Sequence, residues 1–230
     1  MKKSIYLFAL LFSISLSAQK LFWYDVILDV EFKDTNEFER IVDNFYSNKD
    51  FPEGVSMTFS RIPLKGQGFD GTHILSFVAT SSESLAALRG SLSGDKWDNY
   101  MDLVWPYIVK ARSSAGNVMQ SYNMESINPI GQAWMFKIKT KNVPAFASAF
   151  EILMQTFDFT GFVGLAQLTH GSSNGENIAI YGTYEDLNSA FNFGPKSNSE
   201  SKAFADFSKA TADISEFTQT WTRVEIKTYK

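Results

Sequence analysis

The stretch NGENIAIYGTYEDL (Asn174–Leu187) has a counterpart, DGTHILSFVATSSESL (Asp70–Leu85), about a hundred residues earlier in the chain. Each stretch opens with Asn-Gly or Asp-Gly, dipeptides that tolerate the positive φ of a tight turn. Each continues with a short run of alternating apolar residues, a polar break and the start of a helix-like segment. The two turns lie 104 positions apart, which indicates one structural unit that occurs twice.

The apolar pattern upstream of these stretches recurs as well. Phe38, Ile41, Val42 and Phe45 have counterparts 108 positions later in Phe146, Ala149, Phe150 and Leu153. This spacing of i, i+3, i+4, i+7 places apolar side chains on one face of a helix. Asp34 and Asn142 precede the two helices at equivalent positions and are candidate N-caps. The small change in offset is typical of loops that differ in length between two copies of a fold, with chance similarity as the alternative.

Each copy is predicted to contain, in order, a strand, a helix, two strands, a helix and a strand. In the first copy we expect strands at residues 23–32, 55–62, 73–80 and 117–124, helices at 35–46 and 95–109, and a helical turn at 84–90. In the second copy we expect strands at 132–140, 161–169, 177–184 and 219–228, and helices at 143–156 and 199–214. Pro106 is expected to kink or end its helix. The βαββαβ order is the ferredoxin-like split motif, which predicts an α+β fold.

The N-terminus has the layout of a secretory signal peptide. Lys2 and Lys3 form a basic region, Ile5–Leu16 is uncharged and mostly apolar, and Ser17-Ala18 offers a small-residue cleavage site. The apolar run is too short for a comfortable membrane span. We therefore expect residues 1–18 to be removed and the protein to be exported to the periplasm or beyond, with an uncleaved anchor as the alternative.

Composition constrains the mature chain. Residues 19–124 are expected to form the first ferredoxin-like repeat, 125–131 a linker, and 132–230 the second repeat. The chain has no cysteine, so its stability must come from its core, and 21 Phe and 5 Trp predict a core rich in aromatic side chains.

The net charge of the full chain is −4, and no basic run follows the signal segment. Nucleic-acid binding and docking on anionic lipid both require a concentrated positive surface, so neither is expected.

The element order resembles the dimeric α+β barrel superfamily, in particular its fused, duplicated members, over nearly all of residues 20–230. That group includes antibiotic-biosynthesis-type monooxygenases, stress-responsive A/B barrel proteins, haem-degrading enzymes and chlorite-dismutase-like proteins. The resemblance implies two antiparallel ferredoxin-like sheets packed face to face as an intramolecular barrel, pockets between each sheet and its helices, and a monomeric protein. The alternative is a pair of ferredoxin-like domains that does not close into a barrel.

Alternation along the first strand of each copy assigns its two faces. The side chains expected to face the helices are Val26, Leu28, Val30 and Phe32 in the first copy and Trp134, Phe136 and Ile138 in the second. The side chains expected on the opposite face are Asp25, Ile27, Asp29 and Glu31 in the first copy and Met135, Lys137 and Lys139 in the second. Asp29 and Glu31 are therefore equivalent to Lys137 and Lys139 but opposite in charge. We hypothesise that these charges pair between the copies and favour the intramolecular arrangement, the alternative being two independently solvated faces.

Sequence motifs for catalysis or metal binding are weak. The two histidines, His73 and His170, fall at predicted strand ends, and neither has the spacing of a metal ligand. No histidine lies in a predicted helix, so haem ligation by histidine is not expected, and no cofactor or metal is assigned. The glycine-rich GQGFDG (Gly66–Gly71) lies inside a predicted hairpin, where no helix N-terminus can supply a phosphate site.

The monooxygenases that the chain resembles use an apolar, aromatic pocket in which the substrate's own reactivity does much of the chemistry. On that resemblance, and on their size and placement, the candidate ligand-binding residues are Phe59, Trp97, Tyr100, Trp105, Trp134 and Tyr181. The alternative is that all six are core residues; Trp97 and Tyr100, for example, belong to an ordinary apolar helix stripe.

The sequence therefore favours an exported module that binds a small apolar or aromatic ligand, or a protein, without catalysis. The alternative is a cofactor-independent monooxygenase-like enzyme acting on a small aromatic substrate. A third interpretation is an envelope component that meets another protein through a sheet edge. An aromatic compound retained on purification would favour the enzyme.

Overall fold

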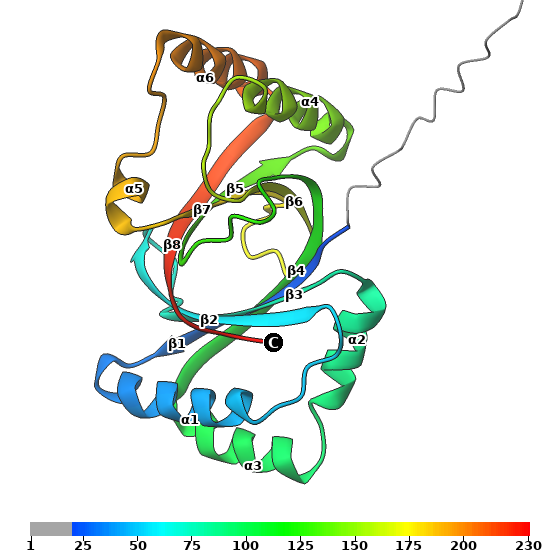
Figure 1. The fold of residues 1–230 in the computed structure, drawn as a ribbon, viewed down its shortest axis with the longest axis vertical. Helices are drawn as coiled ribbons and strands as arrows, with labels where there is room; N and C mark the ends of the chain where they lie inside the picture. Colours follow the sequence, from blue (N-terminus) through cyan, green and yellow to red (C-terminus); the bar gives the residue numbers. More distant parts are fainter. Residues whose placement is uncertain (1–19) are drawn as a thin grey trace, which may run out of the picture.

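The strands expected from the sequence pair into a closed barrel of eight antiparallel strands, with helices on its outside (Figure 1). In this computed structural model, which describes residues 20–230, the first half of the chain contains β1 (Phe22–Val30), α1 (Thr35–Ser47), β2 (Val55–Lys65), β3 (His73–Ala79), α2 (Ser82–Ser91), α3 (Asp95–Val104) and β4 (Ile108–Tyr122). The second half contains β5 (Ile130–Ile138), α4 (Val143–Met154), β6 (Val163–His170), β7 (Ile178–Tyr184), α5 (Leu187–Phe191), α6 (Asn198–Thr211) and β8 (Ser215–Tyr229). The predicted α+β class with two βαββαβ halves is confirmed.

Two long strands close the barrel. The strand order is β1-β3-β2-β8-β5-β7-β6-β4, so the halves meet where β2 pairs with β8 and where β4 pairs with β6. β4 pairs with β1 over residues 108–117 and continues against β6 over residues 115–122. β8 does the same, pairing with β5 over residues 215–224 and with β2 over residues 221–229. This closure excludes the alternative of two open sheets.

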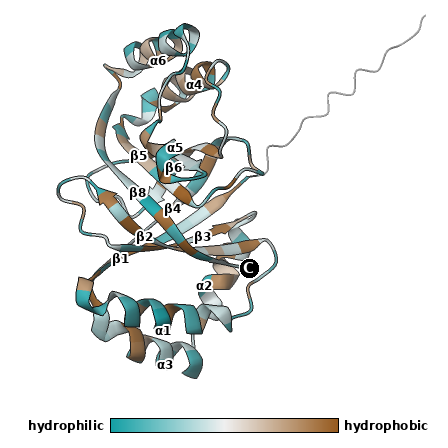
Figure 2. Ribbon diagram, turned by 60° about the vertical axis from the view of Figure 1, so that its left-hand side comes forward, coloured by the Kyte–Doolittle hydropathy of each residue, from teal (hydrophilic) through white to brown (hydrophobic). Residues whose placement is uncertain are grey.

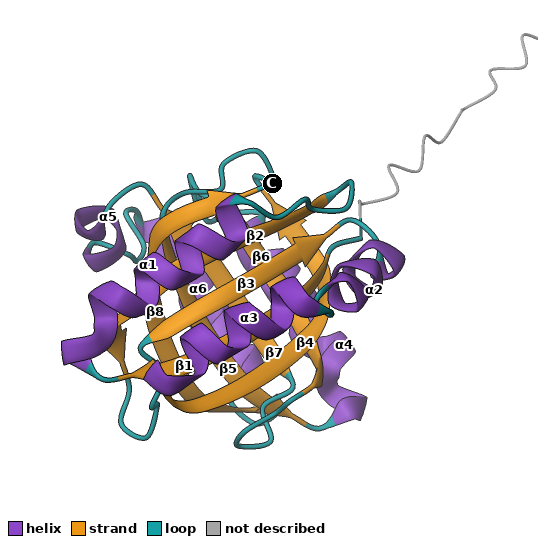
Figure 3. Ribbon diagram, turned by 90° about the horizontal axis from the view of Figure 1, so that it is seen from below, coloured by secondary structure: helices purple, strands orange, loops and turns teal. Residues whose placement is uncertain are grey.

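The helices cover opposite sides of the barrel. α1 and α3 lie across the strands of the first half, and α4 and α6 lie across those of the second half (Figure 3). Hydrophobic and hydrophilic residues alternate along the strands (Figure 2), so each strand gives one face to the helices and the other to the barrel interior. Two separate cores result between sheet and helices, and each contains fully buried phenylalanines, among them Phe38, Phe59, Phe77, Phe146 and Phe150. Burial of one such side chain contributes about 1.5–3 kcal/mol.

The predicted helix-facing sides of β1 and β5 are confirmed in all but one position. Val26, Leu28 and Val30 pack in the first helix-side core, and the helix-facing residues of β5 pack in the second. Phe32 is the exception, because its side chain is 96% exposed. β1 ends at Val30, and Phe32 begins a 3-10 turn (Phe32–Asp34) that leads into α1, so the strand alternation no longer applies to it.

The structure corrects two boundaries in the chain between α3 and β4. The helix predicted to reach residue 109 ends at Val104, and a 3-10 turn (Trp105–Tyr107) around Pro106 follows it. β4 then begins at Ile108, nine residues before the predicted start at 117. The segment Lys110–Gly116 is polar and lacks a β-branched pattern, and its extended conformation comes from pairing with β1.

Helix capping differs from expectation too. Asp34 and Asn142 occupy the N-cap positions of α1 and α4, but neither side chain makes a capping hydrogen bond, because each helix is entered from a 3-10 turn with helical backbone angles. The complete capping box belongs to α6. The hydroxyl of Ser197 accepts a hydrogen bond from the Glu200 N–H at 3.2 Å, and the Glu200 carboxylate accepts from the Ser197 N–H at 3.1 Å.

The hypothesised charge pairs between the halves do not form. Within residues 20–230, Glu31 pairs with Lys33 at 2.9 Å, and Lys137 lies 4.0 Å from Glu216. Asp29 and Lys139 are in none of the ion pairs of that segment. The reason is topological, because β1 and β5 are not neighbours in the barrel and their ends lie beside other strands.

The predicted signal peptide, residues 1–18, lies outside the described residues. No helix within residues 20–230 has the length and apolar character needed to cross a membrane.

Candidate ligand-binding cavity

The barrel encloses a cavity of about 490 Å³. It lies between the strand faces that point away from the helices, and inward-facing side chains of all eight strands line it. This placement corrects the expectation of pockets between each sheet and its helices, where aromatic cores fill the space. Cavities of about 300–1,000 Å³ are typical of small-molecule sites, so this one is large enough for a ligand of two or three fused rings.

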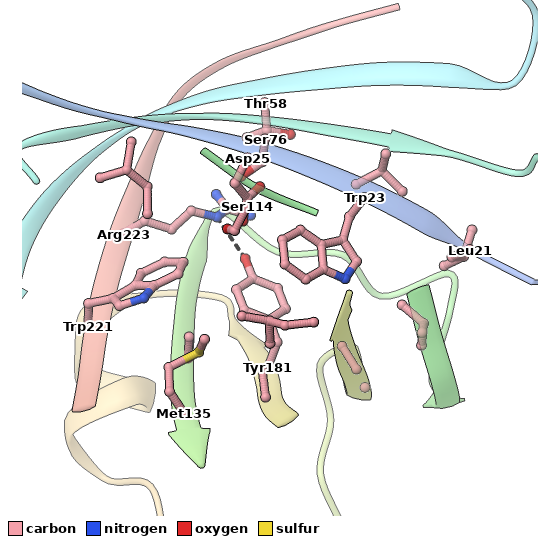
Figure 4. Close-up of a pocket in the computed structure, with 18 of the residues that line it drawn as sticks. Leu21, Trp23, Asp25, Thr58, Ser76, Ser114, Met135, Tyr181, Trp221 and Arg223 are labelled. Atoms are coloured by element: carbon pink, nitrogen blue, oxygen red, sulfur yellow. Dashed lines mark hydrogen bonds between the residues drawn. The ribbon is translucent and has the colours of Figure 1, made fainter. Parts of the chain in front are cut away.

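One wall of the cavity is polar. Strand register places Ser114 of β4 opposite Asp25 of β1, Asp25 opposite Ser76 of β3, and Ser76 opposite Thr58 of β2. The row continues to Thr228 of β8, whose hydroxyl lies 3.0 Å from that of Thr58. The strands of the first half thus present hydroxyl groups and one carboxyl group to the interior, as Figure 4 shows around Asp25.

The facing wall is apolar and aromatic. Register aligns Gly164 of β6, Tyr181 of β7, Ala133 of β5 and Trp221 of β8 in one row. Met135, Ala166, Leu168 and Ala179 extend this surface along the same strands. The small side chains leave room for the cavity, while Tyr181 and Trp221 supply flat ring surfaces at its border (Figure 4). The two halves therefore contribute different chemistry to one cavity.

A buried arginine joins the walls. Arg223 of β8 is 4% exposed, and its Nε donates a hydrogen bond of 2.7 Å to the Tyr181 hydroxyl (Figure 4). Its Nη1 donates to the Ser60 hydroxyl at 3.2 Å and to the Pro129 carbonyl at 3.4 Å. Gly131 makes room for this pair, because a Cβ at that position would lie 2.0 Å from the Tyr181 hydroxyl and 2.8 Å from the Arg223 Nε.

Asp25 is the group most altered by this environment. Burial raises the pKa of its carboxyl to about 7, although a hydrogen bond with Ser76 and the charge of Arg223 act in the opposite direction. Burial also raises the pKa of Tyr181, so that its hydroxyl stays protonated while it accepts from Arg223. At neutral pH the cavity therefore contains a carboxyl group close to half-ionised, beside a fixed positive charge.

Loops complete one end of the cavity. Phe69, in the glycine-rich hairpin loop between β2 and β3, is 4% exposed and lies under the guanidinium of Arg112 at 4.3 Å. Glu176, before β7, is 3% exposed, and its carboxylate accepts hydrogen bonds from the backbone N–H groups of Ser173 and Asn174 at 3.1 and 2.6 Å. Ile127, in the loop between β4 and β5, also borders the cavity and is 65% exposed.

Trp23 of β1 faces the interior from the polar wall (Figure 4). Its indole Nε1 is buried without a hydrogen-bond partner among the described residues. Gly116, its register partner on β4, allows the ring to lie against that strand, because a Cβ there would come within 2.9 Å of the indole.

Of the six ligand-binding candidates from the sequence, the structure brings only Tyr181 to the cavity. Phe59, Trp97 and Tyr100 pack in the helix-side core of the first half. Trp134 packs in the helix-side core of the second half, with its ring 5.0 Å from that of Phe193. Trp105 is 57% exposed in the 3-10 turn that follows α3.

The sequence criteria missed Trp23, Phe69, Arg112, Trp221 and Arg223. Strand alternation carried part of the signal, since it had assigned Asp25 to the face turned away from the helices. The glycines of the loop Gly66–Gly71 indicate no site, and its single phenylalanine, Phe69, is the residue of the loop that lines the cavity.

His73 lies outside this cavity, between α1 and the sheet. It is 2% exposed, and its Nε2 lies 3.1 Å from the Glu39 carboxylate, which also binds Arg61. Burial lowers the pKa of His73, with the hydrogen bond to Glu39 opposing that effect. His170 is exposed at the end of β6. No cluster of three or more His, Asp or Glu side chains within residues 20–230 is arranged to hold a metal ion.

No protein-family model matches the chain, and no curated protein sequence matches it either. Solved structures do share the fold. A candidate monooxygenase from Lactobacillus acidophilus NCFM superposes with a TM-score of 0.63 at 10% identity, over 92% of this chain and 96% of that one. One from Fusobacterium nucleatum subsp. nucleatum ATCC 25586 superposes with a TM-score of 0.63 at 14% identity, over 94% and 96%. An anthrone oxidase-like protein superposes with a TM-score of 0.59 at 12% identity, over 92% and 93%. At these identities the likeness shows the fold alone.

Proposed function

We propose that the barrel interior binds a small aromatic molecule and removes a proton from it, as the first step of an oxidation by dioxygen that needs no cofactor. The observation that carries the proposal is the Asp25 carboxyl, whose pKa of about 7 suits a general base at neutral pH. It borders a cavity with an aromatic wall and a buried arginine. The monooxygenase-type and anthrone oxidase-like names of the structural neighbours support the same direction.

The residues of the cavity have separate roles in this proposal. Ionised Asp25 accepts a proton from an acidic C–H or O–H group of the ligand. The resulting oxyanion is stabilised by the positive charge of Arg223 and by a hydrogen bond from the Tyr181 hydroxyl, which is free to donate because it accepts from Arg223. The apolar wall limits water, which strengthens both interactions.

The oxidation balances with dioxygen as the second substrate. A methylene group flanked by aromatic rings, as in anthrone, loses two hydrogens and gains one oxygen to become a carbonyl. The second oxygen atom leaves as water, so the carbon gives up four electrons and dioxygen accepts four. Deprotonation by Asp25 supplies the electron-rich carbanion that reacts with dioxygen.

Anthrone in air-saturated buffer is the direct test, with oxygen uptake and anthraquinone absorbance as the readouts. We expect the parent to oxidise anthrone faster than buffer alone does, and its rate to increase as the pH rises through 7. Asp25→Asn should lower the enzymatic rate by at least about 100-fold. Asp29→Asn is the matched control, because Asp29 is on the same strand but does not line the main cavity. An Asp25→Asn protein with the parent's rate would refute the proton-transfer role.

A non-catalytic binding module is the second candidate, because the same cavity would hold a ligand without turnover. Tight binding of anthrone, measured by quenching of tryptophan fluorescence, with no oxygen uptake would favour it. Trp23 and Trp221 border the cavity and would report binding.

The history and location of the protein are also proposals. We propose that residues 1–18 direct export, and that residues 19–124 and 132–230 arose by tandem duplication. The spacing of 104–108 residues between matching positions and the recurring element order support the duplication. The barrel closes within one chain, which supports a monomer, and native mass spectrometry of the exported protein would test both the cleavage site and the monomer.

A further inference from the structure

The binding site proposed above contains an arginine, Arg112, that is in none of the ion pairs of residues 20–230. Arg112 of β4 stands opposite Ile27 of β1, on the inward-facing side of the strand, and lines the cavity near the end formed by Phe69. Its Nη2 is buried and has no hydrogen-bond partner among residues 20–230. A buried donor without a partner is unfavourable, and more so when it carries charge, so such a group points to something that binds there.

Three of the nearby carboxylates have other partners, whereas Asp29, which borders a small pocket together with Arg112, is in none of the ion pairs of residues 20–230. Asp70 pairs with Lys110 at 2.6 Å, and this pair lowers the pKa of Asp70 more than the nearby charge of Arg112 does. Glu176 holds its own loop through the backbone N–H groups of Ser173 and Asn174. Asp25 is hydrogen-bonded with Ser76. Within the described part of the chain, Arg112 therefore forms no ion pair.

Aromatic rings connect Arg112 with the catalytic end of the cavity. The Arg112 guanidinium lies over the ring of Phe69, whose centroid is 6.1 Å from that of Trp221. The ring centroid of Trp221 is 6.4 Å from that of Tyr181, and the guanidinium carbon of Arg223 lies 5.8 Å from the Tyr181 ring centroid. A row of rings, inclined to one another by 36° and 48°, thus runs between two arginines, of which Arg223 has three acceptors and Arg112 has a buried donor free.

We infer that the ligand is a flat aromatic molecule carrying an anionic group such as a carboxylate, and that Arg112 binds this group at the Phe69 end while the rings lie along Trp221 and Tyr181. The inference rests on the proposed binding site and names its ligand class. A guanidinium fits a carboxylate with two parallel hydrogen bonds, and burial strengthens that pairing. A water molecule at the same nitrogen would satisfy the hydrogen bond but would give no preference for charged ligands.

Two probes of nearly equal shape separate these cases: naphthalene-2-carboxylate and its neutral analogue naphthalene-2-carboxamide. Dissociation constants would be measured at pH 8 by tryptophan fluorescence and by calorimetry. We expect the parent to bind the carboxylate at least about tenfold more tightly than the amide. Arg112→Gln should abolish that preference and leave amide binding within about threefold of the parent, and Arg112→Lys should keep part of it.

Lys110→Gln is the matched control, because it also removes one positive charge from the same end of β4. Unlike Arg112, Lys110 is exposed and is paired with Asp70. This variant should keep the preference for the carboxylate. Equal binding of both probes by the parent would overturn the inference while leaving the binding site intact. A preference that survives in a folded Arg112→Gln protein would also overturn it. Binding of neither probe would overturn both the inference and the proposed function.

Discussion

Asp25 shows how one residue can be chemically useful at the expense of stability. Its carboxyl borders the cavity at the centre of the polar wall, and burial raises its pKa to about 7. The folded state therefore binds this proton more tightly than the unfolded chain, where an aspartate has a pKa of about 3.9. The stability that this proton provides is complete below pH 4 and is lost as the pH rises through 7.

We predict that Asp25→Asn removes this pH dependence. The difference in free energy of unfolding between variant and parent should shift in favour of the variant by up to about 4 kcal/mol between pH 4 and pH 8. Urea unfolding at several pH values measures it. Taking the difference also cancels the opposite contribution of His73, whose pKa burial lowers. A difference that does not change with pH would show that Asp25 titrates normally.

Gly131 fixes the Tyr181–Arg223 pair by lacking a side chain. A Cβ there would lie 2.0 Å from the Tyr181 hydroxyl, so Gly131→Ala should displace that ring. We predict a loss of about 1–3 kcal/mol of stability and at least about tenfold weaker binding of an aromatic ligand. Thermal unfolding and a fluorescence titration measure the two effects.

Gly90→Ala is the control for that variant. Gly90 lies in α2 with nothing within 4 Å of its added Cβ, so this change should stabilise the protein slightly and leave binding unchanged. Similar effects from the two substitutions would contradict the role assigned to Gly131.

At the scale of elements, patterns local in sequence predicted what local forces decide. The apolar stripes of α1 and α4 and the alternation of β1 and β5 placed these elements and their faces correctly, apart from Phe32. β4 could not be placed in the same way, because Lys110–Gly116 becomes a strand by pairing with β1 and not by its own composition. The five-residue α5 has too few residues for a periodic signal.

The candidate site was harder to predict, because whether an aromatic side chain fills a core or borders a cavity depends on closure of the barrel. Trp134 and Tyr181 look alike in sequence, each being an aromatic residue in a strand. The register of β5 against β7 turns Trp134 toward α5 and α6 and Tyr181 toward the interior. Selection by size alone therefore found four core residues, one exposed residue and one cavity residue.

Among the helices, α6 depends most clearly on its first turn. Ser197→Ala removes the hydroxyl half of the capping box and should reduce the free energy of unfolding by about 1 kcal/mol. Ser208→Ala, in the same helix, is the control, because its exposed side chain makes no hydrogen bond within the described residues and its loss should be neutral or slightly stabilising. Chemical denaturation compares them, and equal effects would mean that the cap contributes nothing.

For the whole molecule, the cavity exists only because the two halves close on each other. The polar row comes mainly from the first half and the aromatic row from the second, so neither half alone contains the site. The join between β2 and β8 forms where the last strand of the chain pairs with the second strand, and Thr58 and Thr228 face each other across it with hydroxyls 3.0 Å apart.

A disulfide at that join tests how much closure contributes to stability. Thr58→Cys with Thr228→Cys places two thiols on directly opposed strand positions in a chain that has no other cysteine. In the chain-entropy model, a crosslink over a loop of this length stabilises by up to about 5 kcal/mol, less any strain from disulfide geometry. We predict that the oxidised protein unfolds at clearly higher urea concentration than the same protein in reducing buffer. If closure of the barrel were loose in solution, the two thiols would oxidise slowly and the unfolding midpoint would stay where the reduced protein has it.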